Sequence, residues 1–184
     1  RERIKDMDVT SRDGDTQKLT EARYGRFAKV LHEFDGWLSR LREDFGSAAA
    51  SFVVDHRLVE TDAEPGTVEQ ALATMDANGY ELAVVEASAD GVQLRVVERE
   101  TGATTTVAVP GALLASPIYA NVRKTYARLV EILGAPPFTI AAGKKTRTAR
   151  SFTELREQAL ELAKEGIQIS RFKGLGEMDA EELA

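Results

Sequence analysis

The amino-acid sequence predicts a mixed α+β fold, with a helical N-terminal half, then a small antiparallel meander, then a hairpin, a helix and a strand. Three observations carry this prediction. Apolar residues recur at three- and four-residue steps early in the chain, which is the helical period. They alternate with polar residues in the middle of the chain, which is the strand period. Turn residues and a helix-start signal then follow one another closely after residue 134.

The N-terminal part begins with a polar segment and continues as a long helix. Residues 1 to about 17 are polar and almost lack apolar spacing, so we expect a flexible end. A helical stripe follows from Leu19 to Phe45. Gly36 is the candidate break in this helix, because an interior glycine costs about 1 kcal/mol relative to alanine. The stripe consists of Phe27, Val30, Leu31, Phe34, Trp37, Leu38, Leu41 and Phe45.

Two shorter helices are expected next. Residues 47–58 are ambiguous, because three alanines favour a helix whereas the Phe-Val-Val run favours a strand. We expect a helix here, with Ser47 as its cap. Thr67 and Gln70 have the spacing of a capping box for a second helix, which would end near Asn78.

Three strands joined by tight turns are predicted in the middle of the chain. They cover Tyr80–Glu86, residues 92–97 and Thr104–Val109. The turns fall at Asp90-Gly91 and Thr101-Gly102. Such short connections join neighbouring antiparallel strands, so we expect a meander.

The last third is predicted to be helix, hairpin, helix and strand. One helix is expected over residues 112–133, because Gly134 and two prolines stop it. A hairpin would turn at Gly143. Ser151 and Glu154 form a second capping box, and the helix that they open would bury Phe152, Leu155, Ala159 and Leu162. A short strand over 167–169 would follow.

Composition excludes several classes of protein. No apolar run approaches the roughly 20 residues that cross a bilayer, so we expect no membrane partner. The absence of cysteine excludes disulfides and thiolate metal sites, and is typical of a cytoplasmic protein. Residues 142–173 contain eight basic and four acidic residues, so they carry +4 and the rest of the chain carries −10. A basic corner on an acidic body suits contact with a polyanion; the alternative is an ordinary solvated surface of mixed charge.

The segment Arg171–Met178, with the sequence Arg-Phe-Lys-Gly-Leu-Gly-Glu-Met, is the most informative stretch of the chain. It lies between the expected strand and the first turn of a helix. Gly174 and Gly176 let the backbone bend and leave amides uncovered, while Arg171 and Lys173 flank them with positive charge. This combination suits a DNA phosphate. The alternative is a simple strand-to-helix turn, in which the glycines serve geometry alone.

All eight residues resemble the signature of the B subunits of bacterial DNA gyrase, where it lies in the last piece of the metal-binding Toprim domain. Pro136-Pro137-Phe138, Gly143-Lys144-Lys145 and residues 164–170 resemble the approach to it. In many of those proteins an insert of about this length interrupts Toprim. We therefore expect residues 1–17 to be a flexible end, 18–134 the insert, and 135–184 the return into a truncated Toprim domain. The chain would then be a fragment of a longer protein.

The resemblance implies a function for the parent and a smaller one for this chain. The parent would be an ATP-hydrolysing, Mg²⁺-dependent type II topoisomerase of the bacterial cytoplasm and nucleoid. Its partners would be duplex DNA, the gyrase A subunit and the rest of the B subunit. We expect the chain to contact the DNA backbone through eight residues: Arg171, Lys173, Gly174, Gly176, Lys144, Lys145, Arg147 and Arg150. The alternative is a module that braces the A subunit without touching DNA.

No complete catalytic site is evident in the sequence, so we expect no activity and no cofactor in this chain alone. The Toprim metal site needs a glutamate and an Asp-x-Asp pair. The Asp6/Asp8 and Asp13/Asp15 pairs have that spacing, but they lie in the polar end and are expected to be solvated. His32 and His56 are too few for a zinc site. Glu177 is expected to accept backbone or basic partners rather than to bind metal.

Overall fold

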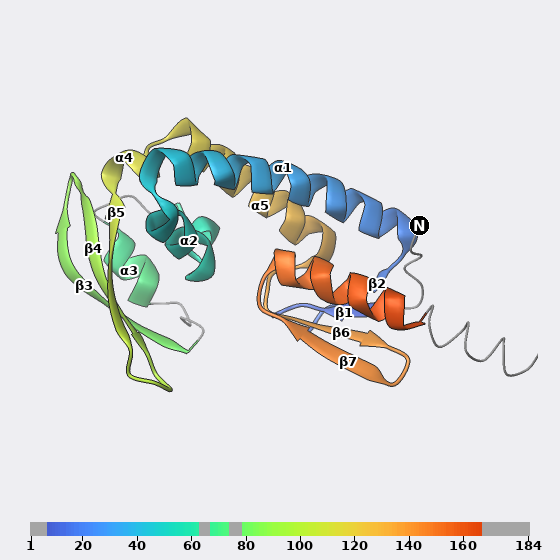
Figure 1. Cartoon of the computed structure of the whole chain (residues 1–184). Coiled ribbons are helices and arrows are strands. Elements are labelled where there is room, and N and C mark those ends of the chain that lie inside the picture. The colour runs from blue at the N-terminus through green and yellow to red at the C-terminus, as the bar shows by residue number, and fades with distance from the viewer. Residues whose placement is uncertain (1–6, 63–66, 74–78, 167–184) are drawn as a thin grey trace, which may run out of the picture. The chain divides into compact units, whose positions relative to one another are not determined.

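The computed structural model describes residues 7–62, 67–73 and 79–166. In these ranges the chain forms helices and two antiparallel sheets, one of four strands and one of three, so the predicted α+β class is confirmed (Figure 1). The chain divides into two compact units. The first unit is Arg1–Leu31 with Leu129–Ala184, and the second is His32–Arg128. The second unit is therefore inserted in the sequence of the first, whereas the boundaries expected for the Toprim insert stay a prediction.

The first unit contains the four-stranded sheet, whose strand order is β2-β1-β6-β7. All three pairs of neighbouring strands are antiparallel. The strands are β1 (Met7–Thr10), β2 (Thr16–Leu19), β6 (Phe138–Ala142) and β7 (Lys145–Ala149). The predicted hairpin is thus confirmed as β6 and β7. The sheet joins the beginning of the chain to a segment near its other end.

The expected flexible polar end is wrong from Met7 onward. Met7 and Val9 are 2% and 0% exposed and point to the same face of the sheet. A strand of four residues offers only two apolar side chains, so its alternation is too short to stand out in a polar segment. Pairing of β1 with the distant β6 supplies the stability that the local sequence does not show.

A helix over residues 152–166 covers one face of this sheet and completes the core of the first unit (Figure 1). The four residues predicted to be buried, Phe152, Leu155, Ala159 and Leu162, are all buried. The ring centroid of Phe152 lies 5.3 Å from that of Phe138 and 6.2 Å from that of Phe27. Tilted ring pairs at such distances add to the stability gained by burying their area. The strand expected after this helix lies outside the described residues.

Helix α1 (Glu21–Phe45) is continuous, so the candidate break at Gly36 is absent. Gly36 is exposed, and the buried apolar stripe on the opposite side of the helix offsets its low helix propensity. Within the second unit α1 lies beside α5 (Pro117–Leu133), where Phe34 packs against Tyr126 and Glu33 pairs with Arg128. Both helices continue into the first unit.

The helix expected over residues 112–133 is two helices. Helix α4 (Gly111–Leu114) ends before Ser116, and α5 begins at Pro117. Proline lacks an amide hydrogen and fits the first position of a helix, so Pro117 starts a new helix rather than continuing the old one. The apolar periodicity runs across the junction and conceals it.

The expected helix after Gly46 is confirmed as α2 (Ser47–Asp55), but its cap is not. Helix α2 begins after Gly46, which has a φ of 88°, and no side chain caps it. The 3₁₀ helix η1 (Leu58–Glu60) follows. Helix α3 is described over Val68–Ala73, where the amide of Ala71 donates to the carbonyl of Thr67. Its expected end near Asn78 lies outside the described residues.

The predicted meander is confirmed as β3 (Tyr80–Ser88), β4 (Gly91–Glu98) and β5 (Thr104–Pro110). One face of β4 and β5 is buried and contributes to the core of the second unit, through Val92, Leu94, Val96, Val107 and Val109. Helices α2 and α4 contact β5. The register between β3 and β4 shifts between Val84 and Glu86, which is a β-bulge.

The helices of the described ranges are all too short or too polar to cross a membrane.

Candidate DNA-contact surface

The candidate surface is built on the β6–β7 hairpin of the first unit. Gly143 has a φ of 60°, which suits the first position of a two-residue hairpin turn. The turn sets Ile140 opposite Arg147 and Thr139 opposite Thr148. Because Ile140 is buried, Arg147 and its strand neighbour Lys145 lie on the face that the helix 152–166 covers.

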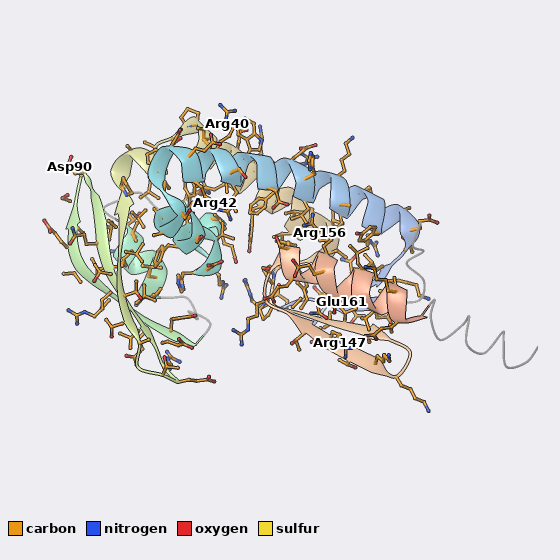
Figure 2. All side chains as sticks on the ribbon, viewed as in Figure 1. Arg40, Arg42, Asp90, Arg147, Arg156 and Glu161 are labelled. Atoms are coloured by element: carbon orange, nitrogen blue, oxygen red, sulfur yellow. The ribbon has the colours of Figure 1, made fainter. Side chains whose placement is uncertain are left out.

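Lys145 and Arg147 both bind Glu165 near the end of that helix. Their nitrogens lie 2.7 and 3.1 Å from the two carboxylate oxygens of Glu165. The hydrogen bond from Lys145, followed by the charges of Lys145 and Arg147, lowers the pKa of Glu165. The carboxylate thus offsets part of the positive charge that the sequence assigns to the hairpin. Figure 2 shows Arg147 on the hairpin and Arg156 and Glu161 on the helix.

Lys144 and Arg150 are placed differently from this pair. Lys144 lies in the turn and is exposed. Arg150 follows the end of β7, and its side chain is exposed as well. Of the four hairpin residues predicted to contact DNA, these two keep their charge away from Glu165. They are therefore the better placed to meet a phosphate.

A modified capping box holds the backbone at Arg150. The hydroxyl of Ser151 accepts a hydrogen bond of 3.1 Å from the amide of Glu154, as predicted. The Glu154 carboxylate accepts one of 2.6 Å from the amide of Arg150, one residue earlier than the usual box. The box therefore fixes the chain where Arg150 leaves the sheet.

Sequence reasoning missed a row of threonines on the opposite face of the same sheet. The strand registers align Thr16, Thr10, Thr139 and Thr148 across all four strands. None is buried, and the hydroxyls of Thr10 and Thr16 lie 2.8 Å apart. Threonine hydroxyls are common donors to DNA phosphates. The row became visible only with the β1–β6 pairing, which no local pattern in the sequence indicates.

The remaining predicted contacts, Arg171, Lys173, Gly174 and Gly176, lie outside the described residues, as does Glu177. Their roles stay predictions. A further basic residue of the same sheet is Lys18, which is exposed on β2.

The described residues that were candidates for metal binding do not lie together, and Asp6 lies outside the described residues. In the described parts of the chain, no three histidine or carboxylate side chains lie close enough to hold a metal ion. Asp8 is exposed on β1, and Asp13 and Asp15 are exposed in the β1–β2 turn. His32 is exposed on α1, whereas His56 is buried between the rings of Phe52 and Tyr80.

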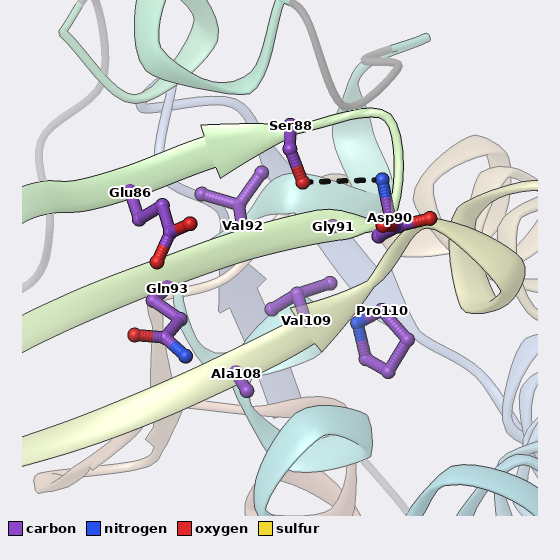
Figure 3. Close-up of a pocket in the computed structure, with 9 residues that line it drawn as sticks. All are labelled: Glu86, Ser88, Asp90, Gly91, Val92, Gln93, Ala108, Val109 and Pro110. Atoms are coloured by element: carbon purple, nitrogen blue, oxygen red, sulfur yellow. Dashed lines mark hydrogen bonds between the residues drawn. The ribbon is translucent and has the colours of Figure 1, made fainter.

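A shallow pocket of about 320 Å³ lies on the meander near the β3–β4 turn (Figure 3). Its lining combines two acids, Glu86 and Asp90, with the amide side chain of Gln93 and with small or aliphatic residues. The amide of Asp90 donates to the Ser88 hydroxyl and so orders the turn.

A polar network in the second unit joins η1 to α5. The hydroxyl of Tyr126 donates to Glu60 at 3.0 Å, and Arg57 also bonds to Glu60. Tyr119, seven residues earlier on α5, is equally buried, and its hydroxyl has no partner among the described residues. Burial raises the pKa of Tyr119 well above its usual value. The contacts of Glu60 hold η1 against α5 within the second unit.

No protein-family model matches the chain, and no curated protein sequence matches it either.

Proposed function

We propose that this chain is a non-catalytic segment of the B subunit of a bacterial DNA gyrase, comprising the Toprim insert and the final Toprim segment. The octapeptide Arg171–Met178 carries the proposal, because all eight residues resemble the gyrase signature. The parent would supercoil DNA by ATP-driven double-strand passage, with Mg²⁺ bound by acids outside this chain. The A subunit and the remainder of the B subunit would be its partners.

The contribution of this segment would be contact with the DNA backbone. The exposed Lys144 and Arg150 and the threonine hydroxyls of β6 and β7 support this role. The helix 152–166 leads directly toward the signature in sequence, so both parts of the surface belong to one stretch of chain. Phosphate contacts carry no base information, so binding would not depend on DNA sequence.

A titration with a labelled duplex of arbitrary sequence tests the proposal. We expect weak binding, in the usual nonspecific range of roughly 10⁻⁴ to 10⁻⁶ M at physiological salt. Affinity should decrease as salt increases, with a slope of about −0.9 per phosphate neutralised. Absence of binding at low salt would reject the DNA role. Chelator-sensitive DNA nicking by the pure chain would reject the non-catalytic assignment.

The second candidate is a module that braces another protein. The second unit favours it, because this unit contains eight Lys and Arg against fifteen Asp and Glu, a net charge of −7. Such a surface repels DNA phosphates and attracts basic proteins. Retention of the chain by the purified A subunit, without any DNA binding, would favour this candidate.

A further inference from the structure

Among the described residues, the three-stranded sheet of the second unit has one open edge. The strand order is β3-β4-β5, so β3 and β5 are the edges. Helices α2 and α4 contact β5, whereas β4 is the main neighbour of β3 among the described residues. Figure 1 shows β3 at the outer side of the meander. At nine residues β3 is also long for an edge strand.

Two hydrogen bonds show which backbone groups of β3 face away from the sheet. The carbonyl of Gly79 accepts from the amide of Arg99, so Gly79 points toward β4. The amide of Glu98, opposite Tyr80, donates instead to Ala103 on the other side of β4. Since this direction alternates along an antiparallel strand, Tyr80, Leu82 and Val84 present their amides and carbonyls to the open edge.

The same three residues offer apolar side chains. Tyr80, Leu82 and Val84 lie on the core face of the meander but are only half-buried. The face therefore continues past β3 without being covered by the described residues. Val85, the bulged residue, is 53% exposed. The bulge interrupts regular pairing at this point, so a regular ladder could extend over residues 80–84 and no further.

Charge indicates what would pair with this edge. Glu81 and Glu86 are exposed on the outer face of β3, and neither forms an ion pair with a described residue. Their cross-strand neighbours, Val97 and Gln93, are uncharged. The unit as a whole carries −7. A second copy of β3 would bring its own glutamates, so self-pairing is disfavoured.

We propose that residues 80–84 of β3 accept an added antiparallel strand from a basic partner protein. Apolar residues of that strand would extend the core face beside Leu82, and alternate lysines or arginines would lie near Glu81 and Glu86. Backbone hydrogen bonds supply affinity in such strand addition, and alternate side chains supply specificity. This proposal does not rest on the DNA-contact role, because it concerns the other unit.

A capped octapeptide of alternating valine and lysine is the probe. Hydrogen exchange of the whole chain should show slow amides at Glu81 and Ala83 and fast amides at Tyr80, Leu82 and Val84. A saturating concentration of the peptide should slow hydrogen exchange at the amides of Tyr80, Leu82 and Val84. N-methylation of the valine amides, which face β3 in this pairing, should weaken binding by threefold to tenfold or more per methyl group. N-methylation of the lysine amides should leave binding unchanged.

Charge exchange gives the second arm of the test. Glu81→Lys with Glu86→Lys should weaken binding of the valine–lysine peptide by roughly threefold to tenfold. The same variant should bind a valine–glutamate peptide more tightly than wild type does. Three outcomes would overturn the proposal: slow exchange of the three amides in the free chain, equal effects of the two N-methylation patterns, or dimerisation of the chain through this edge. Glu43→Lys with Asp44→Lys, at two exposed positions of α1, makes the same change in net charge away from β3 and is the control.

Discussion

The hydroxyl of Tyr126 on α5 donates a 3.0 Å hydrogen bond to the carboxylate of Glu60 on η1. Tyr119, on the same helix, has a hydroxyl that is also buried but has no partner among the described residues. Both residues are 3% exposed. Two buried tyrosines on one helix thus differ mainly in whether the hydroxyl is satisfied.

The two tyrosines give a matched pair of substitutions. Tyr126→Phe should lower the free energy of unfolding by about 1 to 3 kcal/mol, because it removes a hydrogen bond to a charged carboxylate; Arg57 still donates to Glu60 in the variant. Tyr119→Phe should be neutral or stabilising, because it removes a hydroxyl whose burial is not compensated. Urea unfolding of the two variants measures the difference. Equal losses would show that the Tyr126 bond contributes nothing specific.

Gly134 follows α5 at a φ of 85°, and a Cβ there would lie 2.5 Å from the Cβ of Ser11. Gly134→Ala should therefore destabilise the first unit by more than 1 kcal/mol, through both backbone strain and a steric clash. Gly36→Ala is the matched control, because Gly36 is inside α1 with no atom within 4 Å of the added Cβ. It should stabilise by about 0.5 to 1 kcal/mol. Thermal unfolding of both variants checks the opposite signs.

His56 gives the chain a pH-dependent stability. Its side chain is 8% exposed, and burial lowers the pKa of His56 below the usual value near 6.5. The unfolded chain therefore binds a proton more readily than the folded chain. Burial of His56 therefore costs no stability well above pH 6.5. The loss of stability begins as the pH falls through that value and reaches its full size below the folded-state pKa.

The comparison of wild type with His56→Gln isolates this contribution. The free energy of unfolding of wild type should fall more steeply than that of the variant as the pH is lowered from 7 toward the folded-state pKa of His56. Parallel curves over this range would mean that His56 is protonated in the fold without cost.

The elements that the sequence predicts well are those with long local signals. The meander shows alternation over many residues, and the helix after Ser151 combines a capping box with four regularly spaced core residues. Strand β1 is the opposite case, because four residues with two apolar side chains resemble a loop until β6 pairs with them. The helix start at Pro117 was not predicted, because the apolar periodicity continues through the break between α4 and α5.

The candidate surface was predictable only in part, for the same reason. Composition identifies Lys144, Lys145, Arg147 and Arg150 as a basic group, but it cannot show which of them pair with an acidic residue. The pairing depends on the β6–β7 register and on the position of Glu165. Glu165 lies beside Lys145 and Arg147 only because its helix packs on the sheet. The threonine row depends on the β1–β6 register, which joins distant parts of the chain.

The division of the basic group leads to the last prediction, which concerns DNA binding. Lys144→Ala with Arg150→Ala should reduce the salt slope of duplex binding by up to two units, since each exposed charge can neutralise one phosphate. Lys145→Ala with Arg147→Ala should reduce it less, because Glu165 already balances part of their charge. Both double variants remove the same net charge, so a difference between their salt slopes shows an effect of position.

Arg171→Ala with Lys173→Ala should flatten the slope by about two units if the signature contacts phosphate. Arg95→Ala, on the meander of the second unit, should leave the slope unchanged. Equal slopes for the two hairpin variants would show that the hairpin acts through its overall charge, and no change in either would remove it from the DNA-contact surface.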